Sequence, residues 1–164
     1  MKQTIIAVIC FLCVSSLYIQ AQKINHPSLL YTPQRIQQVK QRMQHEPKLQ
    51  EAWGDIKKTA NEALQKKDFN RLDYLSLAYL MTDNKEYADV IKEILLKAVE
   101  AESWGDVEMM ARIPAWRSQL GMAHKSFLSA VGYDAAYNVM PSSERKKIAE
   151  GLKRLAVEPA LGDW

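Results

Sequence analysis

Cysteine is scarce in this 164-residue chain: only Cys10 and Cys13 occur, both within the first 21 residues. The rest of the chain therefore has no intrachain disulfide, cysteine nucleophile or cysteine-ligated zinc. Glycine and proline number six each, too few for a collagen-like or low-complexity chain. The 22 basic and 19 acidic residues leave a net charge of only +3, which argues against a nucleic-acid partner.

The chain contains 48% hydrophobic and 25% charged residues, the balance of an ordinary globular protein. Its length suits one domain with a sizeable core. The histidines stand at positions 26, 45 and 124, without the His-x-x-x-His or Glu-x-x-His spacing of a metal site. No glycine-rich loop suited to cradling phosphate is present. We therefore predict neither a metal site nor another cofactor.

The first 21 residues have the layout of a secretory signal peptide. Lys2 gives a positive start, Ile5 to Ile19 is mostly apolar, and Ala21 is a small residue at a plausible cleavage point. The alternative, a membrane anchor, is disfavoured because an apolar run of about 15 residues is short for a span of roughly 20. We predict a cleaved signal peptide over residues 1–21, export to the periplasm or extracellular space, and no membrane attachment after cleavage.

From Thr32 onward, apolar residues recur at helical spacing, and no stretch shows the alternation of a strand. Thr32 and Pro33 are suited to a helix N-cap and first helical position. Pro159 and Gly162 are expected to end the last helix. The predicted helices carry Ile36–Met43, Leu49–Leu64 and Leu72–Tyr79, run from about Lys85 to Ala101 and from about Trp116 to Tyr137, and carry Ile148–Leu155.

Six helices joined mostly by short loops predict an all-α fold of three antiparallel pairs. The pairs begin roughly 40 residues apart, which would also fit a helical repeat, but no signature recurs at a fixed period. An irregular helical toroid or bundle is the better description. Six helices need not close a toroid, and an open one would leave an apolar face without a partner.

Three stretches carry a family resemblance by their order and spacing. The first is His26-Pro27-Ser28-Leu29-Leu30 followed by the basic helix 34–42, the second is residues 75–88, and the third is Tyr133-Asp134 followed by Met140-Pro141-Ser142-Ser143-Glu144-Arg145. Together with Trp53, they resemble the amino-terminal helical region of the heparinase II/III-like polysaccharide lyases and related alginate lyases. The resemblance covers about residues 26 to 164.

The resemblance implies an incomplete (α/α) toroid followed by β-sheet domains, and cleavage of uronic-acid polysaccharides by β-elimination. In that family a tyrosine and a histidine serve as base and acid, while polar groups neutralise the uronate carboxylate, which stabilises the charge that develops as C5 loses its proton. No residue of this chain matches the catalytic motif, which lies beyond the third helical pair. We therefore assign no catalytic residue.

The resulting hypothesis is that residues 22–164 form a partial toroid domain, truncated at its carboxyl end. It would be the amino-terminal part of an exported lyase, inactive alone, with an acidic, uronate-containing polysaccharide or oligosaccharide as its partner. The alternative is a non-catalytic helical module that binds carbohydrate or another protein.

Candidate substrate-binding residues lie around the predicted fifth helix. On a helical wheel, Arg117, Gly121 and His124 share a face, so Arg117 could pair with a sugar carboxylate and His124 could donate to a sugar oxygen. Trp116 could stack on a sugar ring, and Trp104 could flank the cleft. The structural alternatives are an Arg117 ion pair with an internal acid such as Asp134, a packed His124, a Trp116 on the apolar stripe, and a Trp104 packed as a lid.

Overall fold

The computed structural model describes residues 24–163, and every regular element in that range is a helix. The predicted all-α class is confirmed, whereas the predicted signal peptide lies outside the described residues. No helix between residues 24 and 163 has the length and apolar character to cross a membrane. The helices are α2 (Pro33–Met43), α3 (Pro47–Lys66), α4 (Leu72–Thr82), α5 (Lys85–Ala98), α6 (Val107–Met110), α7 (Leu120–Ala136), α8 (Ser142–Leu152) and α9 (Glu158–Asp163), with 3-10 turns η1 (Phe69–Arg71) and η2 (Tyr137–Val139) and a π-helical turn η3 (Lys153–Val157).

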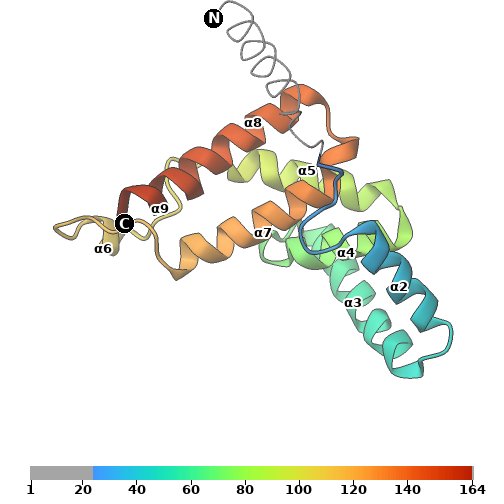
Figure 1. Cartoon of the computed structure of the whole chain (residues 1–164). Helices are drawn as coiled ribbons and strands as arrows, with labels where there is room; N and C mark the ends of the chain where they lie inside the picture. The colour runs from blue at the N-terminus through green and yellow to red at the C-terminus, as the bar shows by residue number, and fades with distance from the viewer. Residues whose placement is uncertain (1–23, 164) are drawn as a thin grey trace, which may run out of the picture.

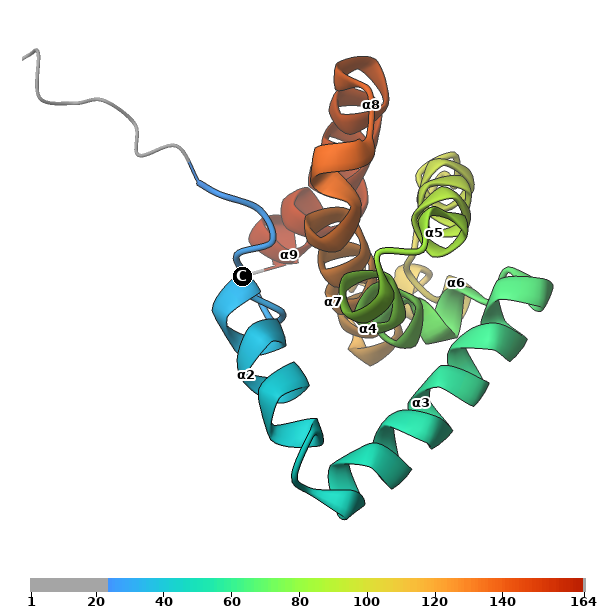
Figure 2. The ribbon, with the colours of Figure 1, turned by 90° about the vertical axis from the view of Figure 1, so that its right-hand side faces the viewer.

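Helix α4 occupies the centre of the core and packs against α3, α5 and α7. Helices α2 and α3 form a hairpin that projects from the other helices (Figures 1 and 2). Helix α8 packs against α5 and α7, and η3 continues it into α9. The central position of α4 matches its sequence, which is apolar over most of its surface. Its buried residues are Leu72, Leu75, Ser76, Ala78, Tyr79 and Met81.

The start of α2 follows the sequence prediction. Thr32 is the N-cap, and its hydroxyl accepts a hydrogen bond from the backbone N–H of Arg35, while Pro33 takes the first helical position. The end of α4 is also determined by an adjacent residue, because Asp83 adopts a left-handed backbone conformation there. The side chain of Asn84 then caps α5 by accepting from the backbone N–H of Glu86. These capping interactions satisfy donors that a helix start leaves unpaired.

Two helix boundaries differ from the prediction. The fourth predicted helix ends at Ala98 rather than Ala101, and the fifth begins at Leu120 rather than at Trp116. The irregular segment between them contains the short helix α6. The later start of α7 matters for function, because Trp116 and Arg117 then precede the helix instead of lying on it.

The last helix does not end at Pro159 and Gly162 as predicted, because α9 includes both residues. The turn η3 widens before the proline, and the backbone N–H of Glu158 donates to the carbonyl of Lys153, five residues earlier. A proline has no N–H and clashes with the carbonyl four residues earlier in an ideal α-helix. A π turn changes that spacing, so α9 continues through Pro159 to Asp163.

Candidate functional site

Residues 112–118, which we call the strap, connect α6 to α7 and are held by one carboxylate from α9. The backbone N–H groups of Arg117 and Ser118 donate to Asp163 Oδ2 at 2.5 and 2.6 Å. The Arg117 guanidinium lies 3.1 Å from Asp163 Oδ1. The Asp163 side chain is only 4% exposed, so the strap is anchored by a buried acceptor.

The electrostatics of Asp163 reflect this anchoring. Burial by itself raises the pKa of a carboxyl group, but hydrogen bonds from the backbone and side chains of Ser118 and Arg117 outweigh that effect. Together they lower the pKa of Asp163 to about 2. The carboxylate is therefore charged at neutral pH, and Arg117 has its counter-ion within the chain.

A cleft of about 520 Å³ lies between the strap and the end of α9. Trp116 lines it with 47% of its surface exposed. The Trp116 indole N–H donates to the carbonyl and hydroxyl oxygens of Ser118 at 3.0 and 3.2 Å, which fixes the orientation of the ring. Arg112 also lines the cleft and has no ion-pair partner within residues 24–163. The cleft thus joins a fixed aromatic ring to a free guanidinium.

The structure brings together only part of the predicted substrate site. Trp116 lies at the cleft, but the Arg117 side chain is engaged by Asp163, not by Asp134 as the structural alternative suggested. His124 is exposed on α7 and lines none of the pockets described for this chain. The shared helical face predicted for Arg117 and His124 is wrong, because α7 begins at Leu120.

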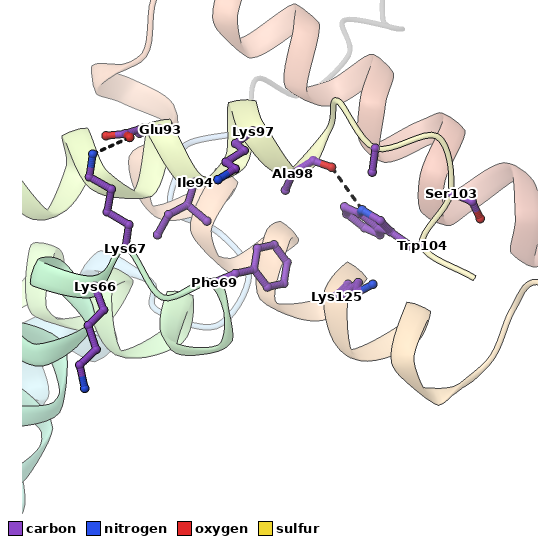
Figure 3. A pocket seen from close by; sticks show the side chains of 11 residues that line it. Lys66, Lys67, Phe69, Glu93, Ile94, Lys97, Ala98, Ser103, Trp104 and Lys125 are labelled. Carbon is purple, nitrogen blue, oxygen red and sulfur yellow. Dashed lines mark hydrogen bonds and ion pairs between the residues drawn. The ribbon is translucent and has the colours of Figure 1, made fainter. Parts of the chain in front are cut away.

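Trp104 belongs to a different pocket, shown in Figure 3. Trp104 is 5% exposed, and its indole N–H donates to the carbonyl of Ala98 at 3.3 Å, so it is a packed residue that borders a cavity. Phe69 meets it edge to face, with ring centroids 6.4 Å apart. The cavity measures about 540 Å³. We call it the lysine pocket, because its charged lining consists of Lys66, Lys67, Lys97, Lys125 and Glu93.

Two of the stretches that carry the family resemblance contact each other. The buried carboxylate of Asp134 on α7 accepts hydrogen bonds from His26 Nδ1 at 2.5 Å and from the backbone N–H groups of Ser28 and Leu29, each at 2.8 Å. The side chain of Asn138 donates to the carbonyl of His26 at 2.7 Å. Residues 26–29 are therefore fastened to the end of α7, more than one hundred positions along the chain.

An aromatic stack extends this contact. The His26 ring lies on Tyr137 with centroids 3.8 Å apart, and the Arg145 guanidinium lies 4.6 Å from the Tyr137 centroid. Tyr133 meets Tyr137 edge to face. Residues from both motif stretches thus form one polar and aromatic cluster.

An exposed apolar surface lies along α7, η3 and α9. Leu120 and Leu161 are 89% and 75% exposed, and Phe127 and Val157 are about half exposed. A shallow groove of about 460 Å³ runs beside them. Its lining is Met122, Ala123, Ser126, Ala156, Val157, Ala160 and Leu161.

Several residues of these sites were missed by the sequence analysis. Arg112 lay in a stretch expected to be irregular, and Asp163 lay beyond the expected end of the last helix. Lys97 and Lys125 were not among the predicted site residues, and both line the lysine pocket. The only local signal was the richness of residues 112–125 in polar side chains.

Comparison with known proteins adds no further constraint, because no protein family, curated protein or solved structure matches this chain. In the part of the chain that the structure describes, no three histidine, cysteine, aspartate or glutamate side chains form a metal-binding group. Inference about function therefore starts from the cleft, the lysine pocket and the motif cluster.

Proposed function

We propose that this chain is the amino-terminal helical part of an exported polysaccharide lyase that degrades uronic-acid polysaccharides by β-elimination. Its role is to bind an acidic saccharide beside the strap. Because no residue here matches the catalytic motif of the resembled family, the chain by itself is expected to give no turnover. The helices are proposed to form part of an incomplete (α/α) toroid.

The observation that carries the proposal is the pairing of Trp116 with Arg112 at the cleft. A half-exposed indole held by Ser118 offers a flat apolar face to the C–H groups of a pyranose ring. A guanidinium without an internal partner can pair with a carboxylate in two-point fashion. Uronic-acid polysaccharides present both features, a sugar ring and a carboxylate, in each uronate residue.

Preorganisation of the strap supports the same proposal. Asp163 fixes the backbone immediately after Trp116 through two N–H groups and the Arg117 guanidinium. A binding loop that is already ordered loses less conformational entropy when a ligand binds. Arg117 is therefore a positioning residue, replacing the direct substrate contact predicted from the sequence.

The motif cluster supports the proposed family. The stretches around His26 and Asp134 were identified by their resemblance to that family, and the two meet at one buried carboxylate that accepts hydrogen bonds from His26, Ser28 and Leu29. A contact of this kind gives a physical reason for both stretches to occur in one chain.

The test is a binding titration with uronate oligosaccharides, measured by calorimetry for the parent protein, Trp116→Ala and Arg112→Ala. We expect each substitution to weaken binding by about tenfold, since one stacked ring or one charge-assisted contact contributes on the order of 1–2 kcal/mol. Arg42→Ala is the matched control, because Arg42 is an exposed arginine on α2 that pairs with Glu46. Equal loss in Arg42→Ala and Arg112→Ala would overturn the proposed site.

A parallel ultraviolet assay tests whether the purified protein has any lyase activity of its own. Elimination creates an unsaturated uronate that absorbs ultraviolet light, so turnover is measured directly. Binding without product supports a binding role and is expected for both the lyase part and the alternative, a non-catalytic carbohydrate-binding module. Robust turnover by the purified protein would contradict the proposed lack of catalytic residues.

A further inference from the structure

The lysine pocket differs chemically from the cleft at the strap. Its interior is apolar, formed by Phe69, Ile94, Ala98, Ala101 and Trp104. Its volume of about 540 Å³ falls within the range of small-molecule sites. Figure 3 shows the lining side chains arriving from α5 on one side and from η1, the end of α3 and α7 on the other.

Positive charge surrounds this apolar interior. Glu93 is the single acidic residue of the lining, and it is already paired with Lys67 at 2.6 Å. Lys66, Lys97 and Lys125 have no ion-pair partner among residues 24–163. They come from three different helices, α3, α5 and α7. Figure 3 shows Lys66 pointing away from the apolar lining, whereas Lys97 and Lys125 lie beside it. A bound anion would offset the positive charge of these two side chains.

The pocket is poorly suited to a sugar. Trp104 is nearly buried, so it offers little ring surface for a sugar to stack on. The Ser103 hydroxyl accepts from the backbone N–H of Gly105 and lies 3.3 Å from Met110 Sδ. The Glu93 carboxylate is engaged by Lys67. The lining therefore offers little to a ligand covered in hydroxyl groups, and much to one with an apolar body.

From this combination we infer that the lysine pocket binds a small amphipathic organic anion. Its carboxylate, sulfonate or sulfate lies beside Lys97 and Lys125, and its aromatic or aliphatic body packs against Phe69, Ile94 and Trp104. Such binding is independent of the acidic-saccharide site at the strap.

Two probes test the inference: 8-anilinonaphthalene-1-sulfonate, with an aromatic body, and dodecanoate, with an aliphatic one. Calorimetry should show saturable one-to-one binding of at least one probe to the folded protein, and the preferred probe identifies the body. The double substitution Lys97→Gln with Lys125→Gln should weaken binding by about tenfold. Lys146→Gln is the matched control, since Lys146 is an exposed lysine on α8 and should leave binding unchanged.

Filling the pocket tests its apolar part separately. Ala101→Leu keeps every lysine but occupies interior volume, so it should also weaken binding of the probe. Circular dichroism and the thermal midpoint of each variant establish that it is folded as the parent is. Trp116→Ala should bind the probe normally, which separates failure here from failure of the saccharide proposal.

Three results would overturn the inference. They are the absence of saturable binding by both probes, unchanged affinity in the double lysine variant, and equal binding of the uncharged analogue N-phenyl-1-naphthylamine. Because the folded state of every variant is measured independently, each of these results bears on the pocket itself.

Discussion

Replacing Asp134 with alanine would remove the acceptor that fastens residues 26–29 to α7. The carboxylate accepts from His26 Nδ1, from the Ser28 N–H and from the Leu29 N–H, at 2.5, 2.8 and 2.8 Å. A hydrogen bond to a charged group contributes about 1.5–3 kcal/mol, but the three are not additive, because the freed donors reach water once the segment detaches. We expect the free energy of unfolding to fall by about 3 kcal/mol.

A loss of that size is a large part of the roughly 5–15 kcal/mol available to a domain. Urea unfolding followed by circular dichroism at neutral pH measures it. Asp134→Asn keeps one oxygen acceptor, so its loss should be smaller, about 1–2 kcal/mol. Asp89→Asn is the control, since Asp89 is exposed and its ion-pair partner among residues 24–163 is Lys92; it should change stability by less than about 0.5 kcal/mol.

The exchange rates of the Ser28 and Leu29 amide hydrogens provide an independent measurement. Both should exchange much faster in Asp134→Ala, even under conditions where the protein remains folded. A stability loss below about 1 kcal/mol in Asp134→Ala, with both amides still protected, would refute the reasoning.

Three further predictions concern other sites. Gly54→Ala should stabilise the protein by about 0.5–1 kcal/mol in urea unfolding, because a Cβ there meets nothing within 4 Å. In the same assay Gly151→Ala should destabilise the protein by about 1–3 kcal/mol, because its Cβ would overlap Val99. Lowering the pH from about 4 to about 2 should release the strap and shift tryptophan fluorescence, since Asp163 has its pKa lowered to about 2 and its stabilising effect is lost as it gains a proton; an unchanged spectrum would contradict this. Burial and, secondarily, Asp73 raise the pKa of Tyr31 to about 12. Its contribution to stability is therefore complete below pH 10 and lost as the pH rises towards 12. The phenolate absorbance that develops near pH 10 should be the same for the folded parent and for Tyr31→Phe, because Tyr31 does not ionise there in the folded protein.

Features that depend on neighbouring residues were predictable from the sequence. The cap at Thr32 needs only an oxygen side chain before Pro33, and the structure contains it. The apolar stripe of α3 was also predicted, and its members Ala60 and Leu64 are buried or partly buried. These signals are local because helix caps and helical faces involve residues at most a few positions apart.

Features that depend on distant residues were not predictable in the same way. The lysine pocket requires the end of α3, η1, α5, the following loop and α7 to meet, and no spacing along the chain encodes that meeting. Lys97 and Lys125 each look solvated when their own helix is considered alone. The Asp134 contacts similarly span more than one hundred positions; the resemblance identified both stretches but not the hydrogen bonds between them.

The last helix continues past Pro159, where the sequence predicted its end, and this continuation shapes the candidate site. A helix that ended at Pro159 would not position Asp163 beside the strap. The π turn at residues 153–157 lets the helix pass the proline, and Asp163 then reaches the N–H groups of Arg117 and Ser118. Those contacts fix the backbone next to Trp116. The geometry of the proposed saccharide cleft therefore depends on a turn that lies about 40 positions further along the chain and does not itself line the cleft.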